Sequence, residues 1–211
     1  MKKASDNAAL VLLNGEVPEP ALVRRAAARC RVLICADGGL RHAVALRLRV
    51  DFVVGDMDSL PRPLPPRGKT LYWCDFDENR SDFEKALAVA LALGCRRVYL
   101  AGMLGGRADH VLVNLGVVER CARAFDVVML DRGAGRLLWP GRHRLGFSRG
   151  RFSLLASPRA VVTLTGARYP LSRFTLLAGG RGLGNAARGE PVLTVHRGRV
   201  WLLYDRPPTS W

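Results

Sequence analysis

Carboxylate side chains gather in one stretch of this 211-residue chain, where nine of its 18 Asp and Glu residues fall within residues 37–84. Asp37 and the pair Asp56 and Asp58 each follow a short apolar run of the kind that forms a buried strand. Because the carboxyl ends of parallel strands line the ligand crevice of an open sheet, we expect these side chains to converge there. Hard oxygen ligands suit Mg²⁺, which also takes water and phosphate oxygens. The pattern predicts a magnesium site, although an Asp-x-Asp pair alone is also typical of a solvated turn.

Asp82 strengthens this prediction. It follows Ser81, and Ser81 with Glu84 three residues later forms the capping box that marks the start of a helix. A carboxylate in the first turn is favoured by the helix dipole, so capping alone would explain Asp82 if it stood by itself. Beside the other aspartates, it favours a part in the same cation site.

A glycine-rich segment lies further along, at residues 102–110, between a predicted strand and a predicted helix. Gly105 and Gly106 would let backbone amides approach phosphate oxygens, and Arg107 could form a bidentate contact with them. The segment matches neither the P-loop nor the full dinucleotide fingerprint, so both of those classes are disfavoured. The competing interpretation is a Gly-Gly turn with a surface arginine, followed by a histidine, His110, that merely packs or caps.

Hydrophobic periodicity predicts the elements that position these residues. Up to about residue 131, short β-rich runs alternate with longer Ala-, Leu- and Arg-rich stretches, which indicates an α/β domain with a mostly parallel, Rossmann-like sheet. We expect strands at residues 9–13, 32–35, 52–54, 70–73, 98–101 and 127–130. We expect helices at residues 19–30, 40–48, 81–93 and 109–124.

The pattern changes after residue 131 to short strand-like segments at residues 136–139, 151–156, 160–165, 192–196 and 200–204. Glycine, proline and arginine separate them, which is typical of a small all-β domain. We therefore expect an α/β domain over residues 1–133 and a β-sandwich domain over residues 134–211. A single domain with a β appendage is the alternative.

Charge is distributed unevenly along the chain, whose net charge is +15. Residues 136–211 hold 13 arginines and only two acidic residues. A positive field favours anionic partners such as nucleotides, nucleic acid or acidic lipid headgroups, but an arginine-rich overall composition explains it equally well.

The remaining composition bounds the setting of the protein. Five cysteines, without C-x-x-C spacing, argue against structural zinc and a disulfide scaffold and favour a reducing compartment. The longest nearly apolar stretch, residues 86–93, is far too short to span a bilayer. We expect a cytoplasmic protein without a membrane-spanning segment.

Five segments, in order, resemble the motifs of the thiamine pyrophosphokinase (thiamine diphosphokinase) family. They are Ala36-Asp-Gly-Gly39, Gly55-Asp-Met-Asp-Ser59, Ser81-Asp-Phe-Glu-Lys-Ala-Leu87, Gly105-Gly-Arg-Ala-Asp-His110 followed by Asn114, and Gly182-Leu-Gly-Asn185. The last is similar to the family's G-L-S-N segment. Each motif is short, but the resemblance extends over about residues 10–205.

The resemblance implies an α/β nucleotide domain followed by a β-sandwich domain, a homodimer, and thiamine bound near its interface. It implies transfer of the diphosphoryl group of ATP to the hydroxyl of thiamine, with Mg²⁺ as cofactor and AMP as the second product. The first domain would then bind nucleotide and Mg²⁺, and the second would bind thiamine and dimerise. Membrane and nucleic-acid partners are not expected.

The resemblance also assigns roles to individual residues. The implied metal and catalytic centre is Asp37, Asp56, Asp58 and Asp82. The implied nucleotide-binding residues are Gly38, Gly39, Gly105, Gly106, Arg107, Asp109, His110 and Asn114. The implied substrate-binding residues are Asp77, Asn79, Ser81, Gly184 and Asn185. Any one of the aspartates could take the proton of the hydroxyl, with Asp82 preferred.

Two departures from the family pattern affect the thiamine contacts. Asn79 stands where family members often carry Asp, and Asp77 or Glu78 could compensate for the missing charge. Gly184 replaces the serine of G-L-S-N and removes a hydroxyl. Thiamine affinity and selectivity therefore depend on the residues that remain.

Three other interpretations compete with this one. Another Mg-dependent transferase, such as one that uses a nucleotide sugar, could place aspartates similarly. A nucleic-acid-binding module could use the arginines together with the aromatic residues Phe147, Phe152, Tyr169, Phe174, Trp201 and Tyr204, although such residues are also ordinary core residues of a β domain. A purely structural protein is disfavoured, because converging carboxylates without a cation repel one another.

Overall fold

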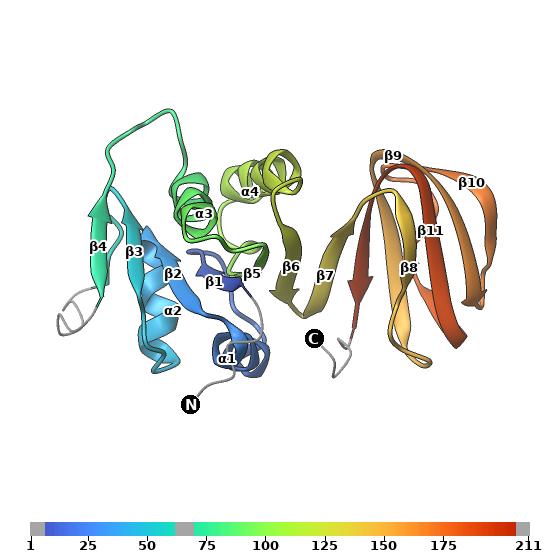
Figure 1. Ribbon diagram of the computed structural model, residues 1–211, viewed down its shortest axis with the longest axis horizontal. Coiled ribbons are helices and arrows are strands. Elements are labelled where there is room, and N and C mark those ends of the chain that lie inside the picture. The colour runs from blue at the N-terminus through green and yellow to red at the C-terminus, as the bar shows by residue number, and fades with distance from the viewer. Residues whose placement is uncertain (1–6, 62–69, 206–211) are drawn as a thin grey trace. The chain divides into compact units, whose positions relative to one another are not determined.

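The computed structural model describes residues 7–61 and 70–205, and the chain divides into two compact units, residues 1–131 and 132–211. Figure 1 shows the helices and the parallel strands in the first unit and the remaining strands in the second. The α/β class with a following all-β part is confirmed.

Six parallel strands form the sheet of the first unit. They are β1 (Ala8–Leu12), β2 (Val32–Ala36), β3 (Phe52–Gly55), β4 (Leu71–Cys74), β5 (Arg97–Ala101) and β6 (Asp126–Asp131). Their order is β6-β5-β1-β2-β3-β4, with β1 paired in parallel to both β2 and β5. Every residue of β1 and β2 is buried, as expected for strands covered on both faces, so the six predicted strands are confirmed.

Four helices connect these strands: α1 (Pro20–Arg29), α2 (Leu40–Ala45), α3 (Asp82–Ala92) and α4 (Ala108–Cys121). The predicted capping box is present, since the Ser81 hydroxyl accepts a hydrogen bond from the Glu84 amide and the Glu84 carboxylate accepts one from the Ser81 amide. Arg120 of α4 contacts the same carboxylate. α2 ends earlier than the predicted residue 48, because the chain turns at Arg47, whose φ is +52°.

Over residues 132–205, the regular elements of the second unit are all strands. They are β7 (Gly133–Leu138), β8 (Gly141–Arg144), β9 (Arg151–Ala167), β10 (Leu171–Leu177) and β11 (Asn185–Tyr204). β11 pairs with β7, β8 and β9, and β9 also pairs with β10. β9 and β11 are each one long strand where the sequence pattern predicts two separate strands. The sequence pattern does not predict β8 or β10, because neither segment shows a clean alternation of apolar and polar residues.

Most aromatic residues that could suit a stacking surface belong to the core of the second unit. Those buried in it or packed against it are Phe147, Phe152, Phe174, Trp201 and Tyr204. The Phe147 ring meets those of Phe152 and Tyr204 edge-on, at 5.5 and 5.0 Å between centroids. Tyr169 is the exposed exception. This arrangement favours the core interpretation of these residues over a nucleic-acid surface.

Within the ranges that the structure describes, no helix is both long and apolar enough to cross a membrane.

Two glycines should respond in opposite ways to replacement by alanine. A Cβ at Gly39 would lie 2.1 Å from the Leu12 carbonyl oxygen, whereas a Cβ at Gly116, inside α4, would meet nothing within 4 Å. We expect Gly39→Ala to lower the free energy of unfolding by about 2 kcal/mol or more, and Gly116→Ala to raise it by about 0.5–1 kcal/mol. Urea unfolding measures both, and a Gly39→Ala midpoint equal to the parent value would contradict the close packing.

Candidate active site

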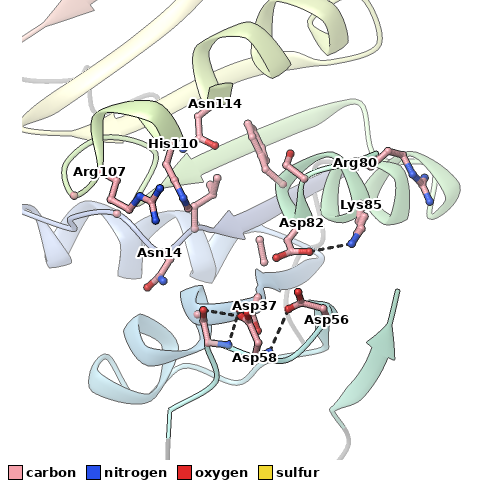
Figure 2. A pocket seen from close by; sticks show the side chains of 18 of the residues that line it. Asn14, Asp37, Asp56, Asp58, Arg80, Asp82, Lys85, Arg107, His110 and Asn114 are labelled. Carbon is pink, nitrogen blue, oxygen red and sulfur yellow. Dashed lines mark hydrogen bonds and ion pairs between the residues drawn. The ribbon is translucent and has the colours of Figure 1, made fainter. Parts of the chain in front are cut away.

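A cleft of about 840 Å³ lies at the carboxyl ends of the strands of the first unit. Figure 2 shows the aspartates on one side of it and Arg107, His110 and Asn114 on another. Most predicted site residues line this cleft: Asp37, Gly38, Asp56, Asp58, Asp77, Ser81, Asp82, Gly105, Gly106, Arg107, His110 and Asn114. The fold thus brings together segments that are separated by more than 70 residues in the sequence.

Three carboxylates form the centre of the cleft. One oxygen each of Asp37, Asp56 and Asp58 lies within 4.8 Å of the other two. Asp37 is buried, and its Oδ2 accepts a hydrogen bond from the Ser59 amide at 3.1 Å. Its Oδ1 is also buried and has no hydrogen-bond partner in the part of the chain that the structure describes. An oxygen in this position is available to a cation.

The backbone around these carboxylates adopts conformations that most residues avoid. Asp37 and Met57 have φ values of +38° and +71°. Gly55 has a φ of +149°, and a Cβ there would lie 2.9 Å from both Asp37 Cβ and Asp82 Cγ. The absence of a side chain at Gly55 therefore lets the two carboxylates approach each other. Backbone strain of this kind is typical of functional sites.

Electrostatics fit a divalent cation at this place. Burial raises the pKa of Asp37 to about 6, with smaller contributions from the negative charges of Asp82 and Asp58, against the opposing Ser59 hydrogen bond. A cation would neutralise this repulsion and satisfy the unpaired oxygen. Three carboxylates with open access to the cleft are donors that suit Mg²⁺. The residues present thus fit the predicted metal.

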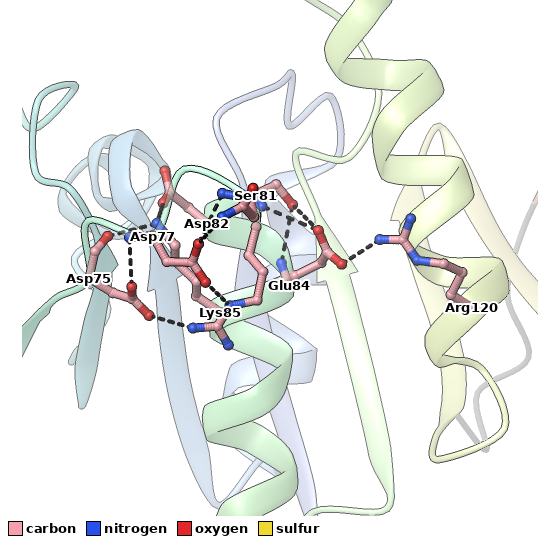
Figure 3. A network of polar contacts seen from close by, with 9 residues as sticks. Asp75, Asp77, Ser81, Asp82, Glu84, Lys85 and Arg120 are labelled. Carbon is pink, nitrogen blue, oxygen red and sulfur yellow. Dashed lines mark hydrogen bonds and ion pairs between the residues drawn. The ribbon is translucent and has the colours of Figure 1, made fainter.

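Asp82 lies in the same cleft but outside the three-residue group. Its Oδ1 accepts a hydrogen bond from Lys85 Nζ at 3.2 Å, and the same Nζ donates to the Asp75 carbonyl oxygen at 2.7 Å (Figure 3). Burial raises the pKa of Asp82, and the Lys85 ammonium opposes that shift. Of the four aspartates predicted at the metal, the structure therefore gathers three and pairs the fourth with lysine.

The glycine-rich loop forms another wall of the cleft. Gly105 and Gly106 have φ values of +77° and +74°, which glycine adopts without strain. The Asn114 side chain donates to the Met103 carbonyl oxygen at 3.0 Å and so ties the loop to α4. The exposed Arg107 side chain lines the cleft and could meet an anionic ligand.

Asp109 supports this loop without lining the cleft. Arg107 Nε donates to Asp109 Oδ1 at 3.1 Å, and this hydrogen bond is the main reason that the pKa of Asp109 falls to about 2. The carboxylate also accepts a hydrogen bond from the His110 amide. We interpret its role as holding Arg107.

Four further predicted residues also lie away from the cleft lining. Gly39 is packed against the Leu12 carbonyl, so its place follows from close packing of the chain. The Asn79 side chain donates to Asp77 at 3.1 Å. Gly184 and Asn185 belong to the second unit.

Asn185 is tied to its own backbone surroundings. Its Oδ1 accepts hydrogen bonds from the amides of Tyr169 and Ala186, and its Nδ2 donates to the Tyr169 carbonyl. The side chain is buried, whereas the neighbouring Leu183 side chain is 71% exposed. The Gly184 amide donates to the Ser153 hydroxyl.

Sequence reasoning missed several residues of the cleft, notably Asn14, Arg41 and Lys85. Asn14 lies two residues after the end of β1, so the rule that located Asp37 at a strand end would have found it. Arg41 donates to the carbonyls of Asn14 and Gly15 and fixes that turn. Lys85 falls on the buried side of α3, where a charged residue is itself a signal.

A parallel sheet with carboxylates and a glycine-rich loop at its carboxyl edge is an arrangement that suits a phosphorylated ligand and a divalent cation. Residues 23–130 match the family model described as the thiamin pyrophosphokinase catalytic domain. The chain belongs to the thiamin pyrophosphokinase family.

Known proteins agree with this membership. The chain is 28% identical to thiamine pyrophosphokinase 1 of Oryza sativa subsp. japonica, over 84% of this chain and 78% of that protein. It is 27% identical to thiamine pyrophosphokinase 2 of Arabidopsis thaliana, over 89% of this chain and 81% of that protein.

Solved structures show the same fold. The thiamine pyrophosphokinase from Bacillus subtilis superposes with a TM-score of 0.81 at 19% identity, covering 94% of this chain and 99% of that one. The enzyme from Geobacillus thermodenitrificans superposes with a TM-score of 0.81 at 20% identity, covering 97% and 100%.

The metal-free protein should lose stability through Asp37 as the pH rises. Its folded pKa of about 6 exceeds the ordinary value of 3.8, so the folded state binds this proton more tightly than the unfolded state. The stabilisation is complete below about pH 4 and disappears as the pH passes 6, which amounts to on the order of 2 kcal/mol. Urea unfolding in the presence of a chelator, from pH 4 to 7, measures it.

Asp37→Asn provides the comparison for this pH dependence, because it keeps the shape of the side chain and removes the charge. We expect its stability to fall less between pH 4 and 7 than that of the parent protein. We also expect added Mg²⁺ to stabilise the parent more than the variant at pH 7. Equal dependence of stability on pH in the two proteins would show that folding does not raise the pKa of Asp37.

Proposed function

We propose that this chain is a thiamine diphosphokinase that transfers the diphosphoryl group of ATP to the hydroxyl of thiamine. The hydroxyl oxygen forms a bond to the β-phosphorus, the bond from that phosphorus to the bridging oxygen of AMP breaks, and the products are thiamine diphosphate and AMP. The observation that carries this proposal is the convergence of Asp37, Asp56 and Asp58 with the loop of Arg107 on one cleft, in a chain of this family.

The reaction needs neutralisation of phosphate charge and alignment of the reacting groups more than it needs covalent catalysis. Mg²⁺ held by Asp37, Asp56 and Asp58 would supply charge neutralisation for the diphosphate. The backbone amides of Gly105 and Gly106 and the guanidinium of Arg107 bind phosphate oxygens from the opposite wall. These contacts hold the diphosphoryl group between the two walls.

Asp82 is our choice for the group that accepts the hydroxyl proton. It faces the cleft from the first turn of α3, and its Oδ1 is held by Lys85. A carboxylate fixed at one oxygen can accept a proton at the other without turning away from the substrate. Asp82 could also contact the metal.

The wider setting is proposed from the family resemblance. We propose that the protein forms a homodimer, that residues 134–211 contribute to thiamine binding through the segment of Gly184, whose shape Asn185 holds from beneath, and that the first unit binds the nucleotide. Asp77, Asn79 and Ser81 would bind substrate from the connection before α3. We also propose a cytoplasmic location, which suits both an ATP-dependent reaction and the buried thiols of Cys35 and Cys95.

Product analysis tests the activity directly. The purified protein is incubated with ATP, Mg²⁺ and thiamine, and the products are separated by chromatography beside a reaction without thiamine. We expect AMP and thiamine diphosphate in equal amounts, and neither without thiamine. Consumption of ATP at the same rate in both reactions would reject the assignment and leave a different Mg-dependent transferase as the next candidate.

Asp56→Asn should fold normally and lose about a hundredfold or more in turnover, because it removes a negative charge from the site that holds the phosphate-bound metal. Steady-state kinetics and urea unfolding of the same preparation measure the two effects. Glu19→Gln is the matched control, since it removes an exposed carboxylate outside the cleft. Turnover near the parent value in Asp56→Asn would rule out this role of Asp56.

A further inference from the structure

Lys85 is a buried cation that lines the acidic cleft. Its side chain is only 5% exposed, and the nearby α3 residues Phe83 and Leu87 are also buried. Lysine is almost never buried this completely unless it is paired, because removing an ammonium from water is costly. Its position therefore requires an account beyond the capping and packing of α3.

The two contacts of Lys85 join the beginning and the end of one connection. Nζ donates to the carbonyl oxygen of Asp75, just after β4, and to the carboxylate of Asp82, at the start of α3. Arg80 holds the Asp75 carboxylate from outside at 3.1 Å, but the Arg80 side chain is 45% exposed. Exposed pairs contribute little, so Lys85 is the firmer of the two attachments.

These contacts determine how Asp82 lies in the cleft. Oδ1 is held on Lys85, and within the described ranges Oδ2 receives no hydrogen bond. Asp82 consequently stays outside the group formed by Asp37, Asp56 and Asp58 while still lining the same cleft. Without the ammonium, nothing in the contacts of the Asp82 side chain would keep it in this orientation.

We propose that Lys85 is a positioning residue for diphosphoryl transfer, which holds the Asp82 carboxylate at one oxygen so that the other faces the reacting groups. This inference rests on the proposed function and adds a residue to it. Lys85 acts through Asp82, and because it lines the same cleft as the three carboxylates, its positive charge opposes their negative potential.

Lys85→Met separates this role from a role in the scaffold. Methionine fills similar apolar volume without charge, so we expect a folded protein whose kcat falls about thirtyfold or more while KM for ATP changes less than threefold. Removal of the positive charge should raise the affinity of the nucleotide-free protein for Mg²⁺ about fivefold, measured by titration calorimetry. A scaffold role predicts instead that kcat, Mg²⁺ affinity and melting temperature fall together, and that result would overturn the proposal.

Arg97→Met is the matched control. It removes a cation of β5 that is paired with Asp126 of β6 at 2.8 Å and does not line the cleft. We expect its kcat and Mg²⁺ affinity to stay within twofold of the parent values. A change in Mg²⁺ affinity equal to that of Lys85→Met would show a general charge effect and would overturn the local one.

A double-mutant cycle tests whether Lys85 acts through Asp82. The combination of Lys85→Met with Asp82→Asn should be about as slow as Asp82→Asn alone, within threefold. Losses that multiply would show that the two residues act independently, against the proposal. If Lys85→Met does not fold, Lys85→Gln takes its place in every measurement, and failure of both to fold would assign Lys85 to the scaffold.

The Mg²⁺ titration also separates this inference from the proposed function. If the parent protein makes no thiamine diphosphate, the proposed function fails while the calorimetry still compares Lys85→Met with Arg97→Met. A rise in Mg²⁺ affinity in Lys85→Met alone would then support an effect of the Lys85 charge on the carboxylates. No rise would reject that effect. Thiamine diphosphate formation with unchanged kcat in Lys85→Met would reject the positioning role alone.

Discussion

The burial of the Asp37 carboxylate beside other carboxylates, at the ends of β2 and β3, is the constraint on which the rest of the site depends. Asp37 is buried, has an oxygen without a hydrogen bond, and lies beside Asp56 and Asp58. Such a group destabilises the folded chain in the absence of a cation. The surrounding fold must therefore be stable enough to hold these side chains together. The fully buried strands β1 and β2 contribute that stability.

Small residues and backbone contacts do much of this holding. Gly55 leaves space for Asp37 and Asp82, and Gly39 lets the short turn after β2 lie against the end of β1. The Ser59 amide fixes one oxygen of Asp37. The capping box of Ser81 and Glu84 sets the beginning of α3 and, with it, the place of Asp82. Only the capping box is local, whereas the contacts of Ser59, Gly39 and Gly55 join different segments of the chain, so each short motif specifies its part of the site only once the sheet has brought the motifs together.

The first unit could be predicted from the sequence because its strands are continuous apolar runs, and the end of each run marks the sheet edge where Asp37 and Asp56 lie. The second unit was predicted less well. Strand β8, with Arg142 and Arg144, carries no alternation, and β9 continues through Pro158, which ordinarily indicates a break. The Asp82–Lys85 pair follows from the i,i+3 spacing on α3. Periodicity could not show that Lys85 would also reach the Asp75 carbonyl, because that contact depends on how α3 packs in the folded unit.

The hydrogen bonds of Asn185 have a consequence for the segment around it. Its amide oxygen is occupied by the backbone of Tyr169 and Ala186, and Gly184 has no side chain to offer. The group that this segment presents outward is the aliphatic side chain of Leu183. A ligand that approaches here meets an apolar surface, so selection among ligands at this point would depend on their shape rather than on their polar groups.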